Sequence, residues 1–208
     1  MTWGKRHYIT LSFGRQVTIM INQSIQLSFR QVRALVEHTL LLFKELDQQL
    51  ANRGYEPILP DVVQTEHGLS IHQTKDSAES LVPHFLTRSY TRQNEKVSNH
   101  ALIVSVQYTH PLHERFDPIV LVGDVMFKQP KQTTKLLLDK PWLLKYAAFE
   151  STAAASFEPT GKRFRTQPIE EIEWLDVWGH PFTEMRDVED VKVLTEEMIK
   201  GHLEPGTP

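Results

Sequence analysis

The segment 109–118 holds the residue types best suited to bind a divalent metal ion. His110 and His113 lie three residues apart, and Asp117 follows four residues later. Imidazole nitrogens and carboxylate oxygens are ligands for Zn²⁺ and Mn²⁺, so the sequence indicates these three residues as metal ligands. Their spacing matches no helical zinc motif, and Pro111 separates the two histidines. A solvated loop is therefore the favoured interpretation of the same residues.

Asp124 stands out because an unpaired carboxylate inside an apolar strand is costly to bury. It follows Gly123 within an apolar run, and Lys128 comes four residues later. Carboxylates that bind Mg²⁺ and a lysine that helps to activate water would make Asp124, Glu114 and Lys128 the catalytic groups of a metal-dependent hydrolase or nuclease. The Glu-x-Lys that such nucleases use on a neighbouring strand is not visible in the sequence. A structural ion pair or an edge position is the favoured interpretation of Asp124.

Two tryptophans and two arginines are candidate contacts for a ligand or a protein partner. Trp174 and Trp178 lie four residues apart, and Arg88 and Arg92 belong to the most basic neighbourhood of the chain. Aromatic rings line many binding grooves, but most of them pack in a protein core, and core packing is the favoured interpretation. A net charge of -3 and a pI near 6.4 argue against nucleic acid as a partner.

Several common catalytic arrangements are missing from the sequence. The chain of 208 residues contains no cysteine, which excludes disulfides, thiolate zinc sites and a cysteine nucleophile. It also lacks the glycine-rich motifs that bind dinucleotides and nucleoside triphosphates, and the G-x-S-x-G motif of serine hydrolases. The standard forms of these protein classes are therefore disfavoured.

Two apolar runs in the middle of the chain organise the predicted fold. Residues 101–108 and 119–127 are rich in β-branched and apolar side chains and have the length of buried strands. The link between them is too short for a crossover helix, so an antiparallel hairpin is expected. The second run is apolar on both alternating faces, which indicates that both faces are covered and that the hairpin is central in its sheet.

The N-terminal quarter is predicted to contain strands followed by one long helix. Residues 7–21 alternate loosely around a glycine, which indicates two short strands or one bent strand. Ser28 and Gln31 fit a capping box, and the helix that begins there is expected to end before Gly54. Its wide apolar stripe is expected to pack on the protein's own sheet. Self-association, or a protein partner, through residues 28–53 is the alternative.

The remaining elements are inferred from caps, prolines and glycines. We expect short strands at 61–64 and 69–72, helices at 76–90 and 139–149, a strand at 169–178, a last helix from Asp187 to Gly201, and a frayed tail at 204–208.

Together these patterns predict a single α+β domain over residues 1–203, with a mainly antiparallel sheet around the central hairpin and three to four helices packed on it. No apolar run is long enough to span a membrane and no signal-peptide pattern is present, so a cytoplasmic location is expected. The favoured function is a non-catalytic binding or regulatory module of a cytoplasmic assembly. The alternative is a metal-dependent hydrolase or nuclease that uses Zn²⁺, Mn²⁺ or Mg²⁺ at segment 109–118 and Asp124.

Overall fold

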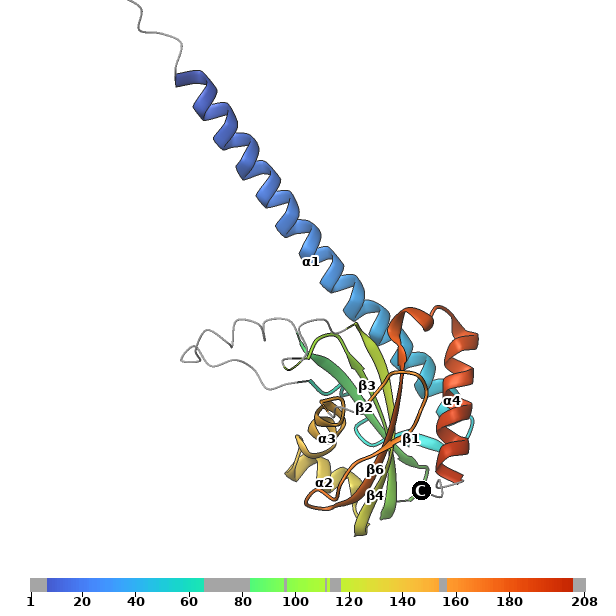
Figure 1. Ribbon diagram of the computed structural model, residues 1–208. Coiled ribbons are helices and arrows are strands. Elements are labelled where there is room, and N and C mark those ends of the chain that lie inside the picture. The colour runs from blue at the N-terminus through green and yellow to red at the C-terminus, as the bar shows by residue number, and fades with distance from the viewer. Residues whose placement is uncertain are drawn as a thin grey trace, which may run out of the picture. The chain divides into compact units, whose positions relative to one another are not determined.

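The computed structural model describes residues 7–65, 83–95, 97–110, 112, 117–153 and 157–203, with side chains placed from residue 23 to residue 200 of these ranges. The elements follow in the order α1 (His7–Ala51), β1 (Tyr55–Pro57), β2 (Phe85–Arg92), β3 (Ser98–Gln107), β4 (Ile119–Lys131), α2 (Thr133–Asp139), α3 (Leu143–Ser151), β5 (Phe164–Arg165), β6 (Ile172–Pro181), the 3-10 helix η2 (Phe182–Glu184) and α4 (Val188–Leu203) (Figure 1). The chain divides into two compact units, residues 1–41 and 42–208. None of the described helices contains a stretch apolar and long enough to cross a membrane.

The second unit is built on one antiparallel sheet with the strand order β1-β2-β3-β4-β6-β5. Strands β3 and β4 pair from Gln107↔Ile119 to His100↔Met126, and they lie in the middle of the sheet. The predicted hairpin and its central position are therefore confirmed, as is the α+β class. The apolar composition of these two runs predicted central strands correctly, because a strand covered on both faces needs apolar side chains at every position.

Helices α2 and α3 cover one face of the sheet (Figure 1). The core on this side joins apolar side chains of β3, β4 and β6 to those of the two helices, and its fully buried members include Ile103, Leu121, Val125, Leu143, Ala148, Leu175 and Val177. Gly123 lies on the same face, where a Cβ atom would be 2.6 Å from Cγ2 of Ile103 and 2.9 Å from Cδ1 of Leu175. The close approach of its neighbours explains why the apolar strand β4 contains a glycine.

Residues 42–51 of α1 and helix α4 cover the opposite face. Phe43, Leu46 and Leu50 of α1 and Leu194 and Met198 of α4 are at most 2% exposed. The sheet contributes the alternate side chains of its strands to this layer, among them Leu102, Val104, Val120 and Val122. Each central strand therefore has two buried faces, one for each layer of helices.

Arg88 on β2 fixes the end of α1 to the sheet. Its guanidinium donates to both carboxylate oxygens of Asp47, with Nε–Oδ1 and Nη2–Oδ2 distances of 2.7 and 2.6 Å, and to the carbonyl of Pro60 at 2.7 Å. Burial acts to lower the pKa of Arg88, but the hydrogen bond and charge of Asp47 raise it overall. Burial, followed by the charge of Asp47, raises the pKa of the adjacent Tyr90 well above its ordinary value. The charged pair of Arg88 and Asp47, with the bond from Arg88 to Pro60, thus joins α1, β2 and the loop after β1.

Two predictions near the N-terminus are wrong. Residues 7–21 are helical, and α1 runs without interruption to Ala51. The segment 7–51 contains no proline, and a single glycine in a helix costs only about 1 kcal/mol, so loose alternation was a poor criterion for strands. The expected cap at Ser28 is also absent, because its hydroxyl bonds the carbonyl of Ser24 within the helix.

The expected helix at 76–90 is wrong over its described part, where β2 runs from Phe85 to Arg92. The residues of β2 alternate between the two faces of the sheet, and its Phe, Thr and Tyr residues favour strands. The first part of that prediction, the strand at 69–72 and the tail at 204–208 lie outside the described residues. At 61–64 the structure has only an isolated bridge, between Gln64 and Thr87.

The C-terminal predictions are closer to the structure. The expected helix at 139–149 corresponds to α3, which begins later, at Leu143 after Pro141, and ends at Ser151. Helix α2, which ends at Asp139, was not predicted. The strand expected at 169–178 is confirmed with shifted bounds, since β6 runs from Ile172 to Pro181. The cap of the last helix is confirmed, because Oδ1 of Asp187 accepts the amides of Glu189 and Asp190. The helix continues through the expected stop at Gly201 to Leu203.

Replacing Arg88 with methionine is expected to lower the free energy of unfolding by about 3 kcal/mol, because Asp47 and the loop carbonyls lose a buried cationic partner. Urea unfolding at neutral pH measures the change. The matched control is Arg53→Met, which removes an exposed pair with Glu196 and should cost less than about 1 kcal/mol. Equal losses in the two variants would contradict the anchoring role of Arg88.

Gly123→Ala is expected to destabilise the second unit by about 1–3 kcal/mol through overpacking. Ile103→Ala removes the methyl group nearest to the new Cβ atom. The double variant should therefore lose less unfolding free energy than the sum of the two single losses, by at least about 0.5 kcal/mol. Additive losses would show that the sheet accommodates the methyl group by another route.

Candidate functional site

Two buried aspartates face each other across neighbouring strands. Asp124 on β4 pairs in register with Asp176 on β6, and the two residues are 1% and 4% exposed. The same row continues to Leu102 on β3 and to Arg165 on β5. Because residues directly opposite in an antiparallel pair share a face, the two carboxylates lie side by side. This arrangement requires a cationic or hydrogen-bonding partner for each of them.

Arg165 is the partner of Asp176. Its Nε and Nη2 atoms donate to Oδ1 and Oδ2 of the carboxylate at 2.6 Å each. The hydrogen bond that Arg165 donates to Asp176 raises the pKa of Arg165, against the opposing effect of burial. The guanidinium carbon lies 4.6 Å from the ring centre of Trp174, so the arginine is held on two sides. Asp176 is thereby neutralised by a planar, bidentate pair.

His100 is a partner of Asp124. The distance from its Nδ1 to Oδ1 of the carboxylate is 3.8 Å, and the imidazole side chain is 30% exposed while that of Asp124 is 1% exposed. The ring of Trp174 meets the imidazole edge-on at 6.1 Å. His100 therefore connects a buried carboxylate to the surface of the protein.

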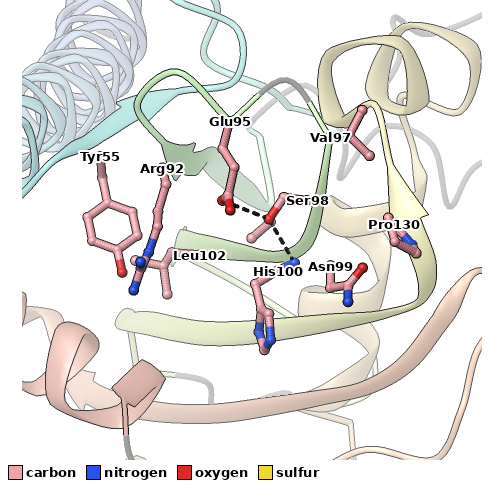
Figure 2. A pocket seen from close by; sticks show the side chains of 10 residues that line it. Tyr55, Arg92, Glu95, Val97, Ser98, Asn99, His100, Leu102 and Pro130 are labelled. Atoms are coloured by element: carbon pink, nitrogen blue, oxygen red, sulfur yellow. Dashed lines mark hydrogen bonds between the residues drawn. The ribbon is translucent and has the colours of Figure 1, made fainter.

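A cavity of about 530 Å³ opens beside His100. Residues from β1, β2, β3, the turn between β2 and β3, and the end of β4 line it: Tyr55, Arg92, Glu95, Val97, Ser98, Asn99, His100, Ala101, Leu102 and Pro130 (Figure 2). Ser98 donates its hydroxyl hydrogen to Oε2 of Glu95 at 3.1 Å and accepts the amide of His100 at 3.1 Å. These two bonds fix the wall of the cavity that leads into β3.

Tyr55 and Arg92 form the opposite wall. They are register partners on β1 and β2, and their side chains lie next to each other and point to the same side of the sheet as His100 (Figure 2). Burial raises the pKa of the Tyr55 hydroxyl, the hydrogen bond and charge of Arg92 lower it, and the negative charge of Asp124 raises it. The net effect is upward, so the phenol stays protonated at neutral pH and can donate a hydrogen bond.

The structure separates Asp124 from His110 and Asp117, the described metal-ligand candidates of segment 109–118. His110 is buried, its ring centre is 4.5 Å from that of Phe149, and its Nδ1 accepts the amide of Leu112. Asp124 is five residues along β4 from Ile119, the first residue after the loop, a distance of roughly 17 Å in a strand. Lys128 lies farther along β4 and is exposed.

The metal-binding prediction is only partly covered by the described residues. Asp117 is exposed, while His113 and Glu114 lie outside the described ranges. In the described part of the chain, no group of three or more histidine, aspartate or glutamate residues is placed to hold a metal ion. A metal site that includes His113 stays a prediction.

The four residues predicted to contact a partner have different environments. Arg88 is buried against Asp47, and Trp178 is 2% exposed with Arg163 stacked on its ring at 4.6 Å. Trp174 is half-buried between His100 and Arg165, and Arg92 is exposed in the cavity. Of this set, the structure leaves Arg92 and Trp174 accessible to a ligand.

Sequence reasoning identified Asp124 and Arg92 but missed most of the other residues of this site, namely Tyr55, Glu95, Ser98, Asn99, His100, Arg165 and Asp176. One signal was available, because Asp176 also interrupts an apolar strand and the argument applied to Asp124 applies to it equally. His100 directly precedes the apolar run at 101–108, but nothing in the sequence gives the register that brings it to Asp124.

Arg165→Gln is expected to lower the free energy of unfolding by about 3 kcal/mol, because it leaves the carboxylate of Asp176 buried beside Asp124. Adding Asp176→Asn removes the unpaired charge, so the double variant should be more stable than Arg165→Gln alone. Urea unfolding at pH 7 measures both. A double variant less stable than Arg165→Gln would show that the pair has no electrostatic role in the sheet.

Comparison with protein-family models found no match for this chain, and comparisons with curated proteins and with solved structures found none either.

Proposed function

We propose that residues 42–208 form a non-catalytic binding domain that takes a small polar ligand in the cavity beside His100. The observation that carries the proposal is the cavity itself, which is open to solvent and lined by hydrogen-bonding side chains. Its volume of about 530 Å³ lies within the range that is ordinary for small-molecule sites.

The walls of the cavity support binding because the fold fixes their positions. Strand pairing sets the places of Tyr55 and Arg92, and the bonds among Glu95, Ser98 and His100 hold the opposite wall. A preorganised site loses less conformational freedom when a ligand binds, which favours affinity. Leu102 provides an apolar floor next to these polar groups.

The wider role that we propose is that of a binding module in a cytoplasmic assembly. Within the predicted contact segment 28–53, Phe43, Leu46 and Leu50 are buried in the second unit, as expected for a helix that packs on its own sheet. Contact with a protein partner would therefore use residues 28–41, where Phe29 is 73% and Leu41 is 61% exposed.

The binding function is tested by filling the cavity. Asn99 is exposed at its rim, so Asn99→Trp should block the cavity without disturbing the core. Saturation-transfer NMR on the full chain, with equal numbers of anionic, cationic and neutral polar fragments, should find binders that the variant no longer recognises. Thr134→Trp, at an exposed position of α2, is the control and should keep them. If Asn99→Trp retains every binder, the cavity is not a binding site.

A further inference from the structure

We propose that the ligand of this cavity carries a carboxylate group, which binds the guanidinium of Arg92. The inference rests on the binding function proposed above and specifies the chemistry of the ligand.

Arg92 differs from Arg88 and Arg165, which lie on the same side of the sheet. Arg88 is engaged by Asp47 and Arg165 by Asp176, each through two hydrogen bonds. Arg92 is exposed and lines the cavity, and none of the ion pairs found among the described residues involves it. A guanidinium offers five N–H donors in a planar fork that matches the two oxygens of a carboxylate. The pairs of Arg88 with Asp47 and of Arg165 with Asp176 show that geometry in the same unit of the protein.

Other donors lie around the place that such a carboxylate would occupy. The hydroxyl of Tyr55 is next to the guanidinium, and the amide of Asn99 and the imidazole of His100 belong to the same cavity (Figure 2). Because the Tyr55 hydroxyl is protonated at neutral pH, it can donate to a carboxylate oxygen. Side chains from three strands would then bind one group of the ligand.

The charges near the cavity favour a single negative charge over two. Glu95 lies on the wall, and Asp124 is buried beyond His100. A phosphate dianion would meet repulsion from both carboxylates, whereas a monoanion has its charge matched by Arg92. A cationic ligand would meet the guanidinium of Arg92, which lies beside Tyr55 on the wall of the cavity. Glu95 is less available to such a cation because it already accepts a hydrogen bond from Ser98.

Four probes of similar size and different charge test the inference on the full chain: benzoate, benzamide, phenyl phosphate and benzamidine, each titrated by NMR. Benzoate should bind at least about tenfold more tightly than benzamide, since a hydrogen-bonded charge pair is worth about that factor or more. Arg92→Gln should reduce benzoate affinity about tenfold and leave benzamide affinity unchanged. Tyr55→Phe should reduce benzoate affinity by a smaller factor.

Arg186→Gln is the matched control, because Arg186 is 78% exposed and lines a separate cavity near α4. Thermal unfolding of Arg92→Gln should equal that of the parent protein, which separates ligand recognition from folding. Equal affinities for benzoate and benzamide, or tighter binding of phenyl phosphate or benzamidine, would overturn the carboxylate assignment. If Asn99→Trp leaves the binding of all four probes unchanged, the binding function itself fails, and the two failures are therefore distinguishable.

Discussion

The register between the central strands determines what the second unit can do. Because Leu102 pairs with Asp124 and Asp124 with Asp176, both carboxylates are directed to the face covered by α1 and α4. A shift of one residue would turn them into the apolar layer beneath α2 and α3. The apolar residues at alternate positions of β3, β4 and β6 therefore hold the polar side chains on the opposite face.

Burial of carboxylates on one face imposes a matching requirement for cations. Strands β2 and β5 meet it, since β2 supplies Arg88 for Asp47 and β5 supplies Arg165 for Asp176. Helix α1 and strand β6 contribute the acids, and β2 and β5 contribute the arginines, whose long side chains reach the carboxylates. Arg165 also packs on the ring of Trp174. Ion pairs thus join β2 to α1 and β5 to β6.

The sequence predicted the parts of the fold that depend on composition alone. Residues 101–108 and 119–127 are so rich in β-branched residues that their composition predicts two strands, and their short link predicts the antiparallel pairing. Asp187 caps the last helix, as its position in the sequence predicts. Residues 7–21 and 85–92 were misassigned because their polar and apolar residues fit both periodicities and the tertiary context decided between them. For the site, composition singled out Asp124. Its neighbours are set by pairing between β4 and β6, about fifty residues apart, and local patterns contain no information on that register.

The position of the cavity follows from where the regular pairing stops. Strand β3 pairs with β4 without a shift as far as His100↔Met126, and the next pair is Ser98↔Lys131. The pairing of β4 with β6 shifts at the same place, between Met126 and Phe127. Such irregularities redirect side chains and leave backbone unpaired, which is why they are frequent next to binding sites. Regular pairing buries Asp124, and its interruption two residues later exposes His100. The imidazole of His100 consequently connects the carboxylate of Asp124 to the cavity, at the point where the regular pairing ends.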